Sequence, residues 1–174
     1  MSFSMYDITV PVFRQTLTAL GGVLDRAIAH CDTKGIDPQT LVGARLIADM
    51  EPFAFHIAAV LNNSVGALAR LRGATSARAE VLSDLALMKV ALADAMTSLE
   101  DVTAAELEGA EAREIILPNP RGDRCFTGHG YLLTLALPNF FFHAATGYDI
   151  LRAQGVELGK RDFLGPLPPR RPPA

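Results

Sequence analysis

The sequence predicts a soluble all-α protein with the architecture of a four-helix bundle. Its 174 residues suit a single domain, because one hydrophobic core commonly serves chains of about 100 to 200 residues. With 49% hydrophobic and 20% charged residues, the chain can bury enough apolar surface to offset the entropy lost when the backbone is ordered. Four long amphipathic segments with mostly short connections supply the helices that a bundle requires.

The first long helix is predicted from Phe13 to the region of Gly35. One apolar stripe alternates in steps of four and three residues, at Phe13, Leu17, Leu20, Leu24, Ala27 and Cys31. The helix is expected to end near Gly35, because glycine tolerates the left-handed conformation of a helix cap. Asp37 and Pro38 then provide an N-cap and a first-turn proline, which predicts a short helix after this end.

The second long helix is predicted over residues 53–71. Pro52 lies in an otherwise helical stretch and lacks a backbone donor, so a break or kink is expected between Met50 and Pro52. Gly73 is expected to end the helix. Its apolar stripe is formed by Phe53, Ile57, Val60, Ser64, Ala67 and Leu71.

The third long helix, over residues 81–102, has the clearest pattern in the chain. Thr75 or Ser76 can cap the segment that contains it. Its apolar positions repeat with coiled-coil spacing, at Val81, Leu85, Met88, Leu92, Ala95, Leu99 and Val102.

An irregular segment separates the third helix from the fourth. Periodicity is lost over residues 108–130, where several prolines and glycines predict turns and residues 114–117 can form a short strand of a hairpin. The fourth helix is expected over residues 131–154, with Pro138 either as a kink or as a first-turn residue, and with Gly155 as its end.

Composition limits the classes of partner and the location. We expect one domain over residues 1–165 and a mobile, extended, proline-rich tail over residues 166–174. The formal charge is −3 and the basic residues are scattered, which argues against nucleic acid as a partner. Because the chain has no signal-like start and no long uncharged apolar run, we expect a cytoplasmic protein that does not enter membranes.

Two histidines and an asparagine are the candidate metal ligands. His56 lies beside the apolar stripe of the second helix and can point toward the bundle axis. Asn139 and His143 are four residues apart on the fourth helix, so both side chains occupy one face, about 6 Å apart. Two imidazoles suit Zn, Ni or Fe(II), whereas an amide oxygen is a weak ligand for such ions. The alternative is a core histidine that only satisfies hydrogen bonds.

Other residues have structural and functional interpretations. His129, between two glycines, is either a mobile third ligand or a solvated loop residue. Consecutive residues of a helix point about 100° apart, so at least one ring of Phe140, Phe141 and Phe142 is expected outside the core, in a pocket or against a second copy of the chain. Tyr148 can reach the same cavity as His143 or lie in the core.

Three stretches of the sequence together resemble a known family. They are SMYDITVPVF near the start, ARLIADMEPF before the second helix, and YLLTLALPNFFFHAATGYDILRAQGVELGKRDFLG over residues 131–165. They resemble an uncharacterised bacterial domain family of the DinB and YfiT-like superfamily. The resemblance covers nearly the whole chain, apart from its proline-rich end.

This resemblance implies an antiparallel four-helix bundle of the DinB type, with an unusually long connection between the second and third helices, and it implies homodimers. Relatives in the superfamily bind a divalent metal, often nickel or zinc, through one histidine of the second helix and an HxxxH pair on the last. Some of them are thiol-dependent transferases or isomerases. The resemblance places His143 at the second position of that pair, Asn139 at the first, and His56 at the ligand of the second helix.

We therefore expect a divalent-metal-dependent enzyme of the thiol-transferase or isomerase type that acts on a small molecule. Its metal, Ni or Zn, would be held by His56, Asn139 and His143. The alternative is a non-catalytic bundle that binds a small ligand or has a structural role as a dimer, with a vestigial metal site. No catalytic residue is assigned from the sequence.

Overall fold

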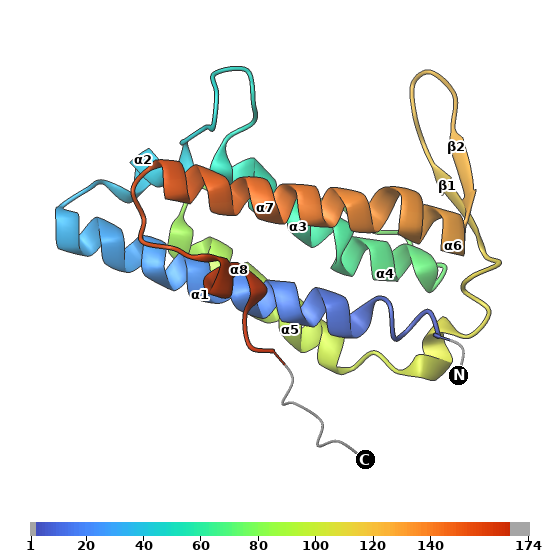
Figure 1. Cartoon of the computed structure of the whole chain (residues 1–174). Helices are drawn as coiled ribbons and strands as arrows, with labels where there is room; N and C mark the ends of the chain where they lie inside the picture. The colour runs from blue at the N-terminus through green and yellow to red at the C-terminus, as the bar shows by residue number, and fades with distance from the viewer. Residues whose placement is uncertain (1–2, 168–174) are drawn as a thin grey trace, which may run out of the picture.

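The chain is mainly helical, with a small two-stranded sheet at one end (Figure 1). The structure is a computed structural model that describes residues 3–167, so residues 168–174 of the expected tail lie outside it. Within this range, no helix has both the length and the apolar character needed to cross a membrane. The elements are α1 (Val10–Lys34), α2 (Pro38–Val42), α3 (Phe53–Asn63), α4 (Val65–Leu71), α5 (Leu85–Glu100), η1 (Ala104–Leu107), β1 (Glu114–Leu117), β2 (Arg124–Thr127), α6 (Gly128–Tyr131), η2 (Leu132–Ala136), α7 (Leu137–Ala153) and α8 (Lys160–Leu164).

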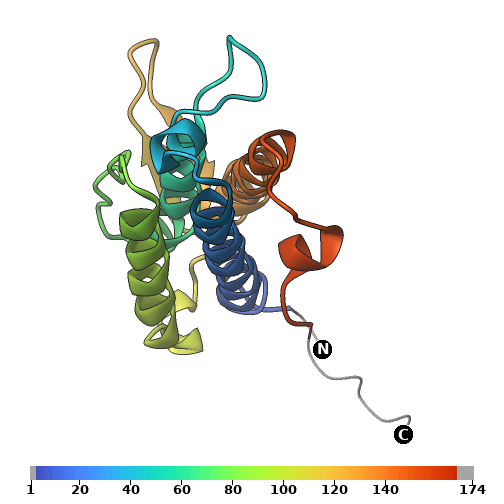
Figure 2. The ribbon, with the colours of Figure 1, turned by 90° about the vertical axis from the view of Figure 1, so that its left-hand side faces the viewer.

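Four helices form the body of the molecule and enclose the core. Helices α1 and α3 each pack against both α5 and α7, and the view along the long axis shows α1 between α5 and α7 (Figure 2). Helices α1 and α7 run in one direction, and α3 and α5 run in the other (Figure 1). Because α4 and α5 run in the same direction, residues 72–84 must return along the molecule to start α5. We call residues 72–84 the return segment.

The first third of the chain follows the sequence prediction closely. Helix α1 ends before Gly35, which has φ 64° and ψ 34°, the left-handed conformation expected at this cap. The Asp37 carboxylate accepts a hydrogen bond from the backbone N–H of Gln39 and so caps α2, which begins at Pro38. Residues 43–52 differ from the prediction, because they form a projecting loop instead of a kinked helix, and α3 begins directly after Pro52.

The predicted second helix is interrupted once. Helix α3 ends at Asn63 and α4 begins at Val65, because Ser64 leaves the helical region with φ −111° and ψ −85°. The Ser64 hydroxyl donates to the carbonyl oxygen of Val60 at 2.8 Å, a local bond that competes with the backbone ladder. The interruption does not disturb the core, since all six positions of the predicted apolar stripe are buried.

The third predicted helix begins four residues late, at Leu85. The Asp84 carboxylate accepts hydrogen bonds from the backbone N–H groups of Ala86 and Leu87, which fixes the N-cap there. The expected caps, Thr75 and Ser76, instead belong to the extended return segment. Val81 is 49% exposed, while the later positions of the stripe are buried.

The final long helix is built in three parts. Helix α6 and the π-helical turn η2 lead directly into α7, so the chain stays helical from residue 128 to residue 153. In η2, the backbone N–H of Leu137 bonds to the carbonyl oxygen of Leu132, five residues earlier. Pro138, near the start of α7, has no N–H to donate to the previous turn, which favours this wider turn over an α-helical one.

The predicted hairpin is present between α5 and α6. Strands β1 and β2 are antiparallel, with Glu114 opposite Thr127 and Leu117 opposite Arg124. The hairpin projects from the end of the body that also contains α6 (Figure 1). Gly128 follows it directly, where an added Cβ would lie 1.9 Å from the carbonyl oxygen of Ala110, so only glycine allows this close backbone approach.

The centre of the core joins α1 to α7 through two phenylalanines. The rings of Phe13 and Phe140 are both fully buried and meet edge to face, with centroids 4.9 Å apart. The neighbouring rings of Phe141 and Phe142 are 41% and 55% exposed, which confirms that the three consecutive phenylalanines cannot all enter the core.

Replacing Phe140 by alanine should lower the free energy of unfolding by about 3 to 5 kcal/mol, because it leaves a cavity against Phe13. Urea denaturation followed by circular dichroism measures this loss. Phe142→Ala is the matched control and should cost less than about 1 kcal/mol, since its ring is largely solvated. Equal losses in the two variants would contradict the proposed position of the core.

Candidate functional site

The candidate site lies where α3 and α7 pack against each other. Gly147 of α7 faces α3, and an added Cβ there would lie 3.5 Å from the ring of Phe53 and 3.8 Å from the Cβ of His56. These are ordinary van der Waals separations, so alanine would fit but a larger side chain would push the helices apart. This close approach brings His56 of α3 next to His143 of α7.

The two predicted histidines are in direct contact. Nδ1 of His56 lies 3.0 Å from Nδ1 of His143, and Nε2 of His56 lies 3.2 Å from the backbone oxygen of Glu51. The His56 side chain is almost completely buried, while His143 is half-buried. The ring of Phe55 packs near His143, and the ring of Phe142 lies near both histidines.

The hydrogen bond to Glu51 determines the tautomer of the pair. A carbonyl oxygen only accepts, so Nε2 of His56 carries the proton and its Nδ1 presents a lone pair. When no other group is bound, Nδ1–H of His143 donates to that lone pair, and Nε2 of His143 is left with a free lone pair. If both Nδ1 atoms are deprotonated, two lone pairs converge on the space between the rings.

Burial keeps both imidazoles neutral. Desolvation, followed by repulsion from His56, lowers the pKa of His143 from 6.5 to about 4. Desolvation also lowers the pKa of His56, although the nearby Glu51 backbone and carboxylate partly oppose this shift. The pair is therefore uncharged at neutral pH, the state in which imidazole accepts a proton or ligates a metal.

Asn139 lies one turn before His143 and lines the same groove. Its Nδ2 donates to the backbone oxygen of Leu135 at 2.8 Å, which leaves its Oδ1 available. The groove has a volume of about 610 Å³ and lies between α3, α7 and the return segment. Its lining residues are Phe55, Ala58, Ala59, Asn62, Asn63, Arg70, Ser76, Arg78, Ala79, Val81, Leu117, Pro118, Tyr131, Leu135, Asn139 and His143.

Two of the three candidate ligands, His56 and His143, are spaced as two ligands of one divalent ion would be. Two imidazole nitrogens that each lie about 2.1 Å from one ion are about 3.0 to 3.4 Å apart, depending on the angle between them. The observed separation of 3.0 Å falls in this range. The hydrogen bond from His56 to Glu51 also resembles the outer contact that orients a ligating histidine. Among residues 3–167, no three His, Cys, Asp or Glu side chains gather, so Asn139 is the remaining candidate ligand.

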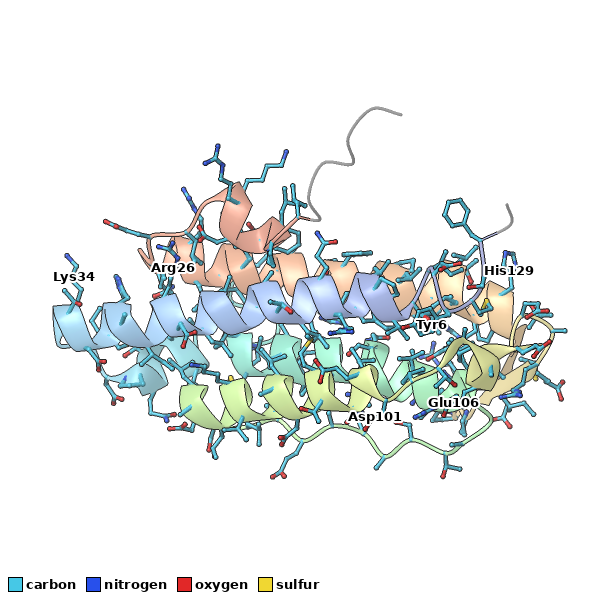
Figure 3. All side chains as sticks on the ribbon, turned by 90° about the horizontal axis from the view of Figure 1, so that it is seen from below. Tyr6, Arg26, Lys34, Asp101, Glu106 and His129 are labelled. Carbon is cyan, nitrogen blue, oxygen red and sulfur yellow. The ribbon has the colours of Figure 1, made fainter. Side chains whose placement is uncertain are left out.

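The other residues considered from the sequence lie elsewhere. His129 is exposed in α6, at the end of the molecule near Tyr6 (Figure 3), and does not line the groove. Tyr148 packs against Phe163 of α8, with ring centroids 5.7 Å apart, instead of entering the groove. His30, near the end of α1, does not line the groove either.

Sequence reasoning missed two arginines of the groove. Arg70 follows Asn63 by about two helical turns, a spacing that can place both on one helix face, so this signal was available. Arg78 could not be found in this way, because it lies in the return segment, whose path depends on contacts with α3.

Comparison with known proteins identifies the family. Residues 5–164 match the family model described as domain of unknown function DUF1993, and the chain belongs to this family. A crystal structure of a DinB family member protein from Shewanella denitrificans has a TM-score of 0.89 and 32% sequence identity, covering 97% of this chain and 96% of that one. No curated protein matches the sequence. The resemblance inferred from the sequence motifs is therefore correct.

The metal-free protein should lose stability as the pH falls from about 6.5 toward 4. The unfolded chain binds a proton at His143 more readily than the folded chain does, because the folded pKa is lowered. The free energy of unfolding should fall by about 1 to 3 kcal/mol over this window, and the contribution is fully present above pH 6.5.

Urea denaturation of EDTA-treated protein between neutral pH and pH 4.5 checks this dependence. His143→Gln is the control, because it keeps a polar side chain without the titration and should show a shallower slope. An identical slope in both proteins would mean that His143 titrates normally.

Proposed function

We propose that this protein is a divalent-metal-dependent enzyme of the thiol-transferase or isomerase type, acting on a small molecule held in the groove. The observation that carries the proposal is the 3.0 Å approach of two neutral imidazoles, one buried and one half-buried, beside a groove large enough for a small substrate. His56, His143 and the Oδ1 of Asn139 would hold the ion. A bound Ni or Zn ion would supply a Lewis acid at the groove wall.

The residues around the proposed metal site would have different roles. His56 is fixed by Glu51 and orients the pair, while His143 lines the groove and can reach a ligand. Phe55 and Phe142 lower the local dielectric around the imidazoles, which strengthens electrostatic interactions there. The asparagine side chains of the groove offer donors and acceptors that can fix the orientation of a substrate.

We also propose the finer architecture and assembly that the family resemblance implies. Helices α1, α5, α7 and the α3–α4 pair would correspond to the antiparallel four-helix bundle of the DinB type. The protein would work as a homodimer in the cytoplasm. The exposed rings of Phe141 and Phe142 support the association, because an exposed apolar patch favours contact with a second copy.

The second candidate function is metal-free binding of a small ligand. It is supported by Asn139, whose amide oxygen is a weak metal ligand. It is also supported by the histidine pair, which can satisfy its own hydrogen bond without an ion. In this case, the free lone pair on Nε2 of His143 would orient the ligand.

Elemental analysis of protein purified without a metal-affinity tag separates the two candidates. The native protein should retain close to one Ni or Zn ion per chain, and His56→Ala and His143→Ala should each retain much less, since two imidazoles hold the ion. His129→Ala is the control and should keep its metal. Absence of metal from the native protein, even after incubation with excess ion and desalting, would favour the ligand-binding function.

Replacing Asn139 by histidine should raise the affinity for Ni or Zn at least about tenfold, because a strong imidazole ligand replaces a weak amide. Isothermal titration with chelator competition measures the change. Asn63→His, in the same groove but on α3, is the matched control and should have a smaller effect. If both variants bind metal like the native protein, position 139 does not face the ion.

A further inference from the structure

The groove beside the histidine pair carries positive charge without acidic neighbours. Arg70 and Arg78 are among its lining residues, and no aspartate or glutamate is among the lining residues that the structure describes. The chain as a whole has a formal charge of −3, so this local excess of cations is unusual for the molecule. We infer that the groove binds the anionic group of a small molecule, a carboxylate or a phosphate, through Arg70 and Arg78.

Arg70 is held in place by a neutral partner. Its NH1 donates to the hydroxyl of Tyr131 at 3.3 Å, and burial raises the pKa of Tyr131, so the hydroxyl stays protonated and uncharged. An added Cβ on Gly66 would lie 3.3 Å from the same NH1, which places the guanidinium over this glycine. The remaining donors of the planar guanidinium are the type that pairs with two oxygens of an anion.

Arg78 comes from a different part of the chain. The return segment is tied to α3 by the backbone N–H of Ala79, which donates to Oδ1 of Asn62 at 2.7 Å. It also passes close to α4, since an added Cβ on Gly66 would lie 2.9 Å from the Ser76 hydroxyl. These contacts hold the return segment, and with it Arg78, at the groove.

Neither arginine is neutralised by the protein. Within residues 3–167, the ion pairs use Arg14, Arg26, Arg45, Arg72 and Lys89, and neither groove arginine lies within ion-pair distance of a carboxylate. A guanidinium without an acidic partner, in a concave site, attracts an anion more strongly than one that is already paired.

The remaining lining predicts the rest of the ligand. Phe55, Val81 and Leu135 offer apolar surface, and His143 lies in the same groove. A fitting ligand therefore has one anionic group and a short apolar body that extends along the groove. Such a molecule would be the substrate class of the proposed function, and its role as a substrate rests on that function. The binding of its anionic group depends on the two arginines alone.

Three probes with related apolar bodies test the inference: 4-phenylbutyrate, phenyl phosphate and the uncharged 4-phenylbutanamide. Each is titrated at millimolar concentration into EDTA-treated, ¹⁵N-labelled protein. At least one anionic probe should shift the resonances of Tyr131 and of the return segment, and the amide should not. Comparison of the two anionic probes shows which type of anion the groove prefers.

Three substitutions show whether the arginines are responsible. Arg70→Gln and Arg78→Gln should each weaken binding of the anionic probe about tenfold, the effect of losing one charge-assisted contact. Arg121→Gln removes the same charge from the exposed hairpin and should bind like the native protein. Arg78 is exposed, so its variant is expected to fold normally even if Arg70→Gln is destabilised by losing its contact with Tyr131.

The inference would be overturned if the uncharged amide bound as tightly as the better anionic probe, if Arg78→Gln kept the native affinity for that probe, or if neither anionic probe shifted these resonances. Metal content is measured on separate, untreated samples of the same proteins. If the protein binds the anionic probe but contains no metal, only the proposed metal chemistry is wrong. If it contains metal but does not bind an anionic probe, only the inferred class of ligand is wrong.

Discussion

The close packing of α3 against α7 is the constraint on which the rest of the site depends. A residue without a side chain, Gly147, faces Phe53 and the backbone end of His56, which sets the separation of the two helices. That separation brings the two imidazoles within 3.0 Å of each other, and it leaves His56 buried and His143 half-buried. The loss of charge on both rings follows from this burial, so helix packing and imidazole chemistry have one physical cause.

Most of the helical structure could be predicted from the sequence, because the stripes that form the core are also the strongest periodic signals. The stripe of the first helix and that of residues 53–71 are buried as expected. The start of α5 could not be predicted from periodicity. It is set by the side chain of Asp84, and Val81, one step earlier on the same pattern, is half-exposed.

The candidate site could be predicted only in part. The contact between His56 and His143 follows from their positions on two helices that face each other, whereas their role as metal ligands stays a prediction. The wall of the groove could not be predicted, because residues 72–84 have no regular secondary structure to which a pattern could point. Their path is fixed by single contacts, such as that between Ala79 and Asn62.

The π turn before α7 has a geometric effect on the groove. Tyr131, Leu135, Asn139 and His143 are spaced by four residues, and all four line it. In a regular α-helix, each step of four residues rotates by about 40°, so three steps would turn Tyr131 about 120° away from His143. The wider turn of η2 absorbs part of this rotation. As a result, Tyr131, which contacts Arg70, and His143, which contacts His56, both face the groove from one continuous helical segment.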